Sequence, residues 1–288
     1  MYNSEPEFIK IITRIASTEK NEPIHGLTSL NDELFIISQK TSEVEVFDAQ
    51  KLTFCRRWKI KKLIEPLDIV ACNRSKRLYI MDYKGRDQSK TMFVVNSNGR
   101  LVTKVRTGFD FGRLSVTGES TIILAVFHCG KLNVYSADGQ FLTEIKLSPD
   151  IVHPRHAIRL TNGDFVVSHG WFEQDAHGVC IVDINGEVKK SYVGKRGSAA
   201  GEMNIPNYLA VDKEGFILVA DLINNRVFLL SPDLKFEKEI LSKSTHSSRY
   251  TMRVIFTESN SRLLVVDNEF DSVNTLWSDG QIFVFNMK

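Results

Sequence analysis

The feature that most constrains this fold is a unit of short apolar segments that recurs along the chain. In its fullest copy, residues 197–236, β-branched and aromatic runs stand at 209–211, 216–219 and 227–230. Asp-Lys-Glu-Gly separates the first two runs, and Ser-Pro-Asp separates the third from a fourth that begins near Lys235. Short runs bounded by such turn residues predict antiparallel β-strands. Four strands of this kind cannot bury both faces alone, so the unit needs neighbours of the same kind.

Copies of this unit follow one another at intervals of roughly 40 to 48 residues, which is the range of propeller repeats. The second-strand segment recurs from Leu34, Leu78, Asp164 and Leu263. The third and fourth strands recur together from Val44, Met92, Leu132 and Val179. Spacing, order and turn residues therefore agree at several places in the chain.

The fullest copy resembles an NHL repeat. The resemblance lies in the glycine-rich lead at 197–201, Pro206 before an apolar strand, Val-Ala-Asp at 219–221 and Asn-Asn-Arg-Val at 224–227. NHL repeats are single blades of a β-propeller. The resemblance covers the whole chain as architecture and roughly one blade as motif.

Periodicity and resemblance together predict an all-β fold, a six-bladed β-propeller of four-stranded antiparallel blades. We expect one domain over residues 1–288, with blades near 25–60, 66–105, 112–147, 154–193, 206–241 and 250–288. The last blade contains three strands, and residues 7–15 supply its fourth. An alternative for this N-terminal segment is an amphipathic helix, because Ser4 and Glu7 form a capping box. The isoleucines and the open edge of the ring favour the strand.

Composition narrows the class of partner. A 288-residue chain with 42% hydrophobic residues can build a core, and a net charge of +2 argues against binding nucleic acid by bulk charge, although not against a local basic patch. Four cysteines without a Cys-x-x-Cys motif predict free, mostly buried thiols in a reducing compartment. No signal peptide and no membrane-spanning run is recognisable. We therefore expect a cytoplasmic monomer with no membrane partner and no cofactor.

Topology places the candidate site on one face of the ring. The connections between blades and the loops between second and third strands share one face, which we call the connection face. The tight Asp-Gly and Asn-Gly hairpins share the other, the hairpin face. Binding groups concentrate on variable loops that a rigid scaffold holds. The predicted contacts on the connection face are Tyr83, Lys84, Arg86, Arg113, Arg155, His156, Trp171, Phe172, Asn207, Tyr208, Arg249, Tyr250, Arg253 and Trp277.

Part of this set repeats from blade to blade. Arg155-His156, Asn207-Tyr208 and Arg249-Tyr250 stand at equivalent positions near the starts of three inner strands. One interpretation is a ring of donors and stacking groups around the channel mouth. The other is ordinary polar packing inside a crowded channel.

The function we expect is that of a non-enzymatic scaffold that binds a protein or peptide. NHL propellers of the tripartite-motif type are protein- and RNA-binding modules, so the resemblance also implies an alternative, single-stranded or hairpin RNA on the same face. Blade six is predicted to carry a long loop from Asp267 to Gly280, and its acidic residues at 267–279 favour the protein partner. For RNA, reversing the charges of Arg155 and Arg249 should abolish retention.

A further alternative is a metal-dependent lyase or hydrolase, since some propellers of this architecture are zinc lyases. His153, His156 and His169 lie close in sequence, with His25 and His246 at other blade entrances. A metal site needs several such ligands to converge. No catalytic motif accompanies them, so we expect neither catalysis nor a metal.

Two further groups are predicted to be structural. Arg226 of the Asn-Asn-Arg motif is expected to bridge to Asp221. Asp82, Asp221 and Asp267 end the second strands of three blades and are expected to accept backbone N–H bonds.

Overall fold

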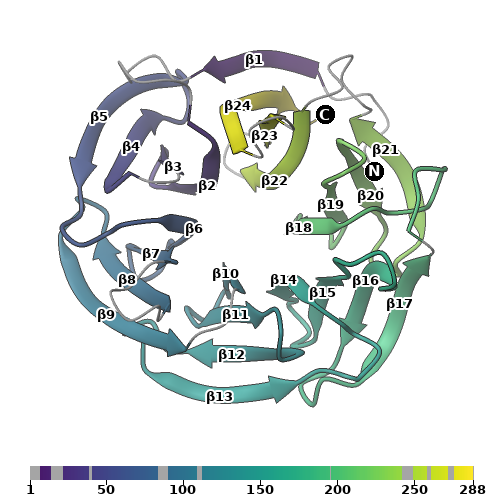
Figure 1. Cartoon of the computed structure of the whole chain (residues 1–288). Coiled ribbons are helices and arrows are strands. Elements are labelled where there is room, and N and C mark those ends of the chain that lie inside the picture. The colour runs from purple at the N-terminus through teal and green to yellow at the C-terminus, as the bar shows by residue number, and fades with distance from the viewer. Residues whose placement is uncertain are drawn as a thin grey trace.

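The fold is a ring of six β-sheets around a central axis, as Figure 1 shows. The computed structural model describes residues 7–13, 22–38, 41–83, 90–108, 112–194, 196–241, 249–257, 261–271 and 276–287. Each sheet contains four antiparallel strands, and in blades one to five the chain order runs from the innermost strand to the outermost. The structure therefore confirms the predicted six-bladed β-propeller.

The first three blades are regular meanders. Blade one consists of β2 (Ile24–Leu30), β3 (Glu33–Ser38), β4 (Glu43–Asp48) and β5 (Thr53–Lys59). Blade two consists of β6 (Pro66–Cys72), β7 (Arg77–Asp82), β8 (Lys90–Asn96) and β9 (Leu101–Gly108). Blade three consists of β10 (Gly112–Val116), β11 (Ile122–Val126), β12 (Lys131–Tyr135) and β13 (Phe141–Lys146).

Blades four and five repeat the same order, whereas blade six joins the two ends of the chain. Blade four consists of β14 (Pro154–Arg159), β15 (Phe165–His169), β16 (His177–Val182) and β17 (Val188–Gly194). Blade five consists of β18 (Pro206–Val211), β19 (Ile217–Asp221), β20 (Arg226–Leu230) and β21 (Phe236–Leu241). Blade six consists of β22 (Arg249–Thr257), β23 (Arg262–Asp271), β24 (Leu276–Asn286) and β1 (Glu7–Thr13).

The N-terminal segment closes the ring as a strand and not as a helix. β1 pairs antiparallel with β24, from Glu7 opposite Asn286 to Thr13 opposite Gln281. A side-chain amide adds a second link between the blades on either side of the closure. The Asn268 amide accepts from the Ile24 N–H at 2.9 Å and donates to the Ile24 carbonyl at 3.0 Å. Blade six is therefore fastened both to the N-terminal strand and to blade one.

The predicted loop at 267–280 is largely strand. β23 continues to Asp271 and β24 begins at Leu276, and Phe270 is paired with Trp277 across the two strands. The expectation of a long loop over residues 267–280 is therefore wrong. The two strands extend the hydrogen-bonded ladder beyond Asp267. In this way the backbone N–H and C=O groups of both strands remain paired.

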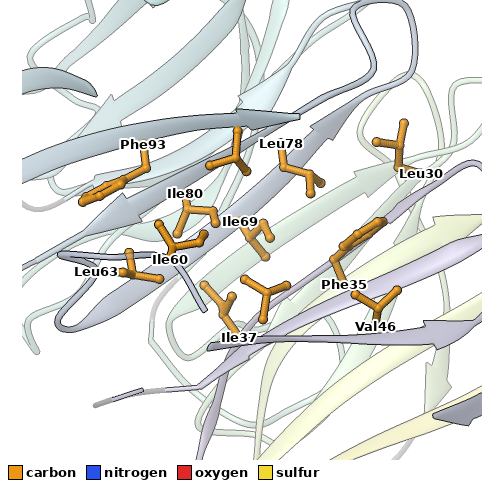
Figure 2. Close-up of a cluster of buried hydrophobic side chains, with 12 residues drawn as sticks. Leu30, Phe35, Ile37, Val46, Ile60, Leu63, Ile69, Leu78, Ile80 and Phe93 are labelled. Atoms are coloured by element: carbon orange, nitrogen blue, oxygen red, sulfur yellow. The ribbon is translucent and has the colours of Figure 1, made fainter. Parts of the chain in front are cut away.

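Apolar side chains fill the spaces between neighbouring blades. Six clusters of buried hydrophobic residues each combine residues from two adjacent blades. Figure 2 shows the cluster between blades one and two, where Phe35, Ile37, Ile69, Ile80 and Phe93 meet. Since each blade buries both faces against its neighbours, removing one blade exposes two cores.

The hairpin face carries the predicted glycine turns. Gly99, Gly139 and Gly186 follow Asn or Asp between the third and fourth strands of blades two, three and four, with φ between 83° and 85°. This left-handed region costs a residue with a Cβ more than it costs glycine. At Gly186 a Cβ would also lie 1.8 Å from the Lys146 carbonyl oxygen.

Two compositional expectations can be compared with the structure. Cys72 and Cys180 are buried and Cys55 and Cys129 are exposed, all with free thiols, so the prediction of mostly buried thiols holds for two of the four. Within the described ranges, no helix is long and apolar enough to cross a membrane.

Candidate functional site

The inner strands β2, β6, β10, β14, β18 and β22 surround the central axis (Figure 1). Near the connection-face ends of five of them lies a group of polar side chains that we call the channel cluster. Its members are all buried, with between 0% and 7% of their surface exposed. They are Asp68, Arg113, Arg155, His156, Asn207, Tyr208 and Arg253.

Asp68 is the centre of the channel cluster. Its Oδ1 accepts from the Ile69 N–H at 2.9 Å, and its Oδ2 accepts from the Leu114 N–H of blade three at 2.7 Å. The Arg253 guanidinium of blade six donates to the same carboxylate and, at 2.7 Å, to the Ile69 carbonyl. One carboxylate therefore links blades two, three and six.

His156 continues the network through blades four and five. Its ring stacks on the Tyr208 ring with centroids 3.8 Å apart. Nδ1 accepts from the Leu209 N–H at 3.2 Å, so Nε2 carries the proton and donates to the Leu114 carbonyl at 3.1 Å. Burial lowers the pKa of His156 well below its usual value, and the Arg253 guanidinium lowers it further. This imidazole is therefore neutral.

Arg155 connects the channel cluster to the surface. It donates to the Asn207 amide oxygen at 2.6 Å, and the Asn207 amide donates to the Met252 carbonyl at 2.6 Å. Its guanidinium carbon lies 4.3 Å from the centre of the Trp171 ring and 5.2 Å from that of Phe127. Such cation–π contacts hold both groups in place.

Around this arginine lies an aromatic cluster on the connection face. Phe127 contacts the rings of His128, His153 and Trp171, with centroids 4.7, 4.9 and 6.1 Å away. His153 also contacts Phe172 edge-on at 4.9 Å. Phe172 is 42% exposed, so its ring is accessible from solvent.

The loop that presents these rings is tied down by its own polar groups. The Asp175 carboxylate accepts from the Trp171 and Phe172 N–H groups at 2.9 and 2.8 Å and contacts His153 Nδ1 at 2.7 Å. Burial opposes ionisation of Asp175, but these hydrogen bonds prevail and lower its pKa. His177 Nε2 donates to the Phe172 carbonyl at 3.0 Å, since its Nδ1 accepts from the backbone. The loop is therefore preorganised.

The remaining predicted contacts are distributed elsewhere. Tyr83 is partly exposed and has the Lys90 ammonium 3.1 Å from its ring centre. Tyr250 contacts Phe270, and Arg249 is buried and donates to the Asp267 carbonyl at 3.3 Å. Lys84 and Arg86 lie outside the described residues, and Trp277 is described only by its place in β24. The structure therefore brings the candidates of blades four and five together with Arg113 and Arg253.

Five residues of the two clusters and the Asp175 loop were not predicted as contacts. Phe127, His128, His153 and Asp175 were not distinguishable as a group, because their proximity depends on the packing of blade three against blade four. Asp68 had a usable signal, since it is a charged residue within the apolar run 66–70. A buried charge in a central strand requires a partner elsewhere in the fold.

The two structural predictions hold in part. Asp221 accepts from the Asn204 N–H at 2.7 Å and from Arg226 Nε at 2.9 Å, and Asp82 accepts from the Glu65 N–H at 2.7 Å. Both carboxylates therefore accept backbone N–H bonds, as predicted. The bonded residues belong to the segment that enters the same blade. Asp267 differs, because Thr251 and Arg249 act on its carboxylate.

A cavity of about 730 Å³ lies at the hairpin-face end of the inner strands. Its lining includes Asn31, Cys72, Arg74 and Thr117. None of these residues was predicted as a contact, because the turns that carry them are short and resemble one another.

Comparison with known proteins supports the fold and leaves the family open. No protein-family model matches the chain, and no curated protein matches it. The NHL resemblance is therefore not confirmed.

Solved structures do match the whole ring. A streptogramin B lyase has a TM-score of 0.64 at 10% identity, covering 97% of this chain and 87% of that one. Virginiamycin B lyase from Staphylococcus aureus has a TM-score of 0.65 at 8% identity, covering 96% and 99%. Hydrazine synthase from Kuenenia stuttgartiensis has a TM-score of 0.62 at 15% identity, covering 91% and 80%. At these identities the similarity establishes a propeller fold and nothing more.

Asp267 of blade six provides a test of how stability depends on pH. Burial raises its pKa to about 6, against the effects of Thr251 and Arg249. Because the folded pKa lies above the unfolded one, ionisation of Asp267 destabilises the fold as pH rises from about 4 to about 6. We expect Asp267→Asn to remove up to about 3 kcal/mol of this loss.

The measurement is the free energy of unfolding in guanidinium chloride at pH 4, 5, 6 and 7. The variant should be less stable than the native chain at pH 4, or equal to it, and gain relative to it toward pH 7. Asp32→Asn, at an exposed carboxylate, is the matched control. Parallel pH profiles for the native chain and Asp267→Asn would contradict the prediction.

Proposed function

We propose that the chain is a non-enzymatic interaction platform that binds a protein or peptide partner through the aromatic cluster. The observation that carries this proposal is the exposed Phe172 ring on a loop fixed by Asp175 and His177. Interfaces derive much of their affinity from a few aromatic anchors near their centre. A loop that is already ordered loses little conformational entropy on binding.

The mixed charge of this surface suits a peptide. Asp175 and His153 form one pair beside the aromatic cluster, and Arg155 is covered by Trp171 and Phe127. The surface therefore offers apolar area with a small number of polar contacts at its border. This is the anatomy of a protein–protein contact, with an apolar centre and a polar rim.

RNA binding is the less well supported alternative. Arg113, Arg155, Arg249 and Arg253 are each 7% exposed or less, so their guanidinium groups are not positioned to contact a phosphate chain lying on the surface. Charge reversal at Arg155 and Arg249 would also place carboxylates in buried sites. The resulting loss of stability would be indistinguishable from a loss of RNA contacts.

Catalysis is supported less well than binding. Two of the similar structures are lyases, and one solved virginiamycin B lyase is a histidine-to-alanine variant described as catalytically inactive. In the present chain, both nitrogens of His156 are engaged by backbone groups, so this imidazole is a poor candidate for proton transfer. Among the described residues, no three His, Cys, Asp or Glu side chains converge as metal ligands would.

The test compares two exposed phenylalanines. Phe172 is 42% exposed on the connection face, and Phe141 is 56% exposed on the outer strand β13. Photo-crosslinking from position 172 in a lysate, followed by mass spectrometry, identifies the partner, and affinity is then measured for Phe172→Ala and Phe141→Ala. We expect Phe172→Ala to weaken binding at least about 30-fold, because an anchor of this kind contributes 2 kcal/mol or more.

Phe141→Ala should bind as tightly as the native chain, since it removes the same side chain from another surface. The proposal would be overturned if Phe172→Ala bound the identified partner with unchanged affinity. Recovery of RNA in place of protein from position 172 would overturn the proposal and support RNA binding at this site.

A further inference from the structure

Positive charge is concentrated in one sector of the chain. The whole sequence contains 37 Lys and Arg residues against 35 Asp and Glu residues, for a net charge of +2. Residues 51–106, which run from the turn before β5 to near the end of β9, contain 15 basic and four acidic residues. This segment therefore carries +11, and the remainder of the chain carries −9. Such an asymmetry points to an anionic partner for the basic sector.

Basic side chains on other outer strands are neutralised by carboxylates. On β5, Arg56 donates to Glu33 at 2.8 Å, and on β17 the Lys189 ammonium lies 2.8 Å from Asp164. Four exposed lysines of blades one and two have no such ion pair with any residue that the structure describes, and we call them the lysine patch. They are Lys59, Lys61, Lys62 and Lys104.

The core between blades one and two brings the lysine patch together. The turn at 59–63 joins β5 to β6 and carries three of the four lysines. Its Ile60 and Leu63 are buried beside Phe93, as Figure 2 shows. The ammonium of Lys104, on β9, lies 4.2 Å from the centre of the same Phe93 ring. The lysine patch therefore lies at the outer edge of the ring, where β5 and β9 are the outermost strands (Figure 1).

The charges within the patch repel one another. Burial and then the Lys62 ammonium lower the pKa of Lys104, while Asp82 acts in the opposite direction. Asp82 is itself buried, and its carboxylate accepts from the Ile64 and Glu65 N–H groups at 3.2 and 2.7 Å. This carboxylate is therefore engaged inside the fold, and an anion at the surface would relieve the repulsion between the lysines.

Exposed aliphatic side chains accompany these cations. Ile64 ends the turn and is 46% exposed, and Leu101 and Val102 on β9 are 40% and 47% exposed. Val102 lies on the same face of β9 as Lys104, because alternate residues of a strand share a face. A purely polyanionic partner would contact the lysines and leave these side chains in water. An anionic bilayer accommodates both, since its headgroups attract lysine and its acyl boundary accepts apolar side chains.

We propose that the lysine patch and its aliphatic neighbours attach blades one and two to the surface of an anionic lipid bilayer. The ammonium groups contact lipid headgroups, and Ile64 and Val102 enter the boundary between headgroups and acyl chains. Attachment at the surface needs no membrane-spanning segment, so this proposal replaces the sequence-based expectation of no membrane partner. It goes beyond the proposed function, whose aromatic cluster lies on blades three and four.

The first measurement is cosedimentation of the native chain with sucrose-loaded vesicles. The vesicles contain phosphatidylcholine alone, or phosphatidylcholine with about 30% phosphatidylserine as the anionic lipid. We expect the partition coefficient on anionic vesicles to be at least about 100-fold higher, because each lysine near an anionic surface contributes about a factor of five. Raising sodium chloride from about 0.1 M to about 0.5 M should remove most of this difference.

Paired variants then separate the lysine patch from net charge. Lys62→Gln with Lys104→Gln should lower the partition coefficient on anionic vesicles about 30-fold. Lys189→Gln with Lys190→Gln changes the net charge equally on β17, where the lysines have carboxylate partners, and should lower it by less than about threefold.

A second pair of variants tests the aliphatic contacts. Ile64→Ser with Val102→Ser should lower the partition coefficient about 10-fold, because apolar area then no longer leaves water on binding. Leu142→Ser, at a 52% exposed leucine of β13, should bind as the native chain does. Thermal unfolding verifies that each variant is folded. Phe172→Ala should also bind vesicles normally, so the two proposals are tested independently.

Equal binding of the native chain to neutral and anionic vesicles would overturn the proposal without any variant. Equal losses in the two lysine pairs would also overturn it, because net charge alone would then explain the attraction. Polyuridylate and polyglutamate are tested in the same buffer. If either binds through Lys62 and Lys104 while anionic vesicles do not bind, the lipid assignment is wrong and the patch recognises nucleic acid or an acidic protein.

Discussion

Replacing Asp68 with asparagine is expected to lower the free energy of unfolding by about 3–5 kcal/mol. The substitution preserves the shape of the side chain and removes its charge. Arg253, which is 2% exposed, then remains as a buried cation without its carboxylate, and the positive charge of the channel cluster increases. The cost of a buried unpaired charge exceeds the net contribution of the pair itself.

A double-variant cycle with Arg253→Met tests this reasoning by denaturant unfolding. Removing both partners should cost less than the sum of the two single losses, because neither charge is then left alone. Strict additivity of the two losses would contradict the prediction. It would indicate that Asp68 acts through its backbone hydrogen bonds from Ile69 and Leu114 and not through Arg253.

Deletion of residues 1–13 is expected to destabilise the chain by several kcal/mol and to make it prone to self-association. The deletion removes β1 and its six register positions on β24, each of which contributes on the order of 0.2–1 kcal/mol. It also leaves β24 as an open strand edge, which favours pairing with another molecule.

Thermal unfolding and sedimentation velocity measure the two effects separately. Deletion of residues 1–6 alone is the control, because it leaves β1 intact. A synthetic peptide of residues 7–13 added to the shortened chain should restore part of the lost stability and suppress self-association. Unchanged stability after deletion of residues 1–13 would contradict the role of β1.

The fold was largely predictable because each blade carries a local signal. Apolar runs such as 263–266 and turns such as Asn98-Gly99 specify strands and hairpins from neighbouring residues alone. The closing strand was also predictable, since a ring whose last blade contains three strands requires a fourth. The extended hairpin of β23 and β24 was not, because its residues lack the alternation of a typical strand.

The site was less predictable because exposure depends on the arrangement of blades. Arg155 and Tyr208 stand near the starts of inner strands, and the sequence left open whether they surround an accessible channel mouth or pack inside a crowded channel. Six inner strands converge on one axis, so these side chains fill the space between them. The exposed ring of Phe172 belongs instead to a loop beside the axis, which the sequence identified only as one of several aromatic loops.

The pairing of β1 with β24 also determines when this protein can finish folding. The strands of blades one to five can pair in the order of their synthesis, because the strands of each blade are consecutive in the chain. β1 precedes the other strands of the ring in the chain, and its partner β24 follows them. Until β24 has been synthesised, β1 is an apolar segment without a sheet. Closure of the ring is thus a late, long-range step, and this interval is when a chaperone would have the most to protect.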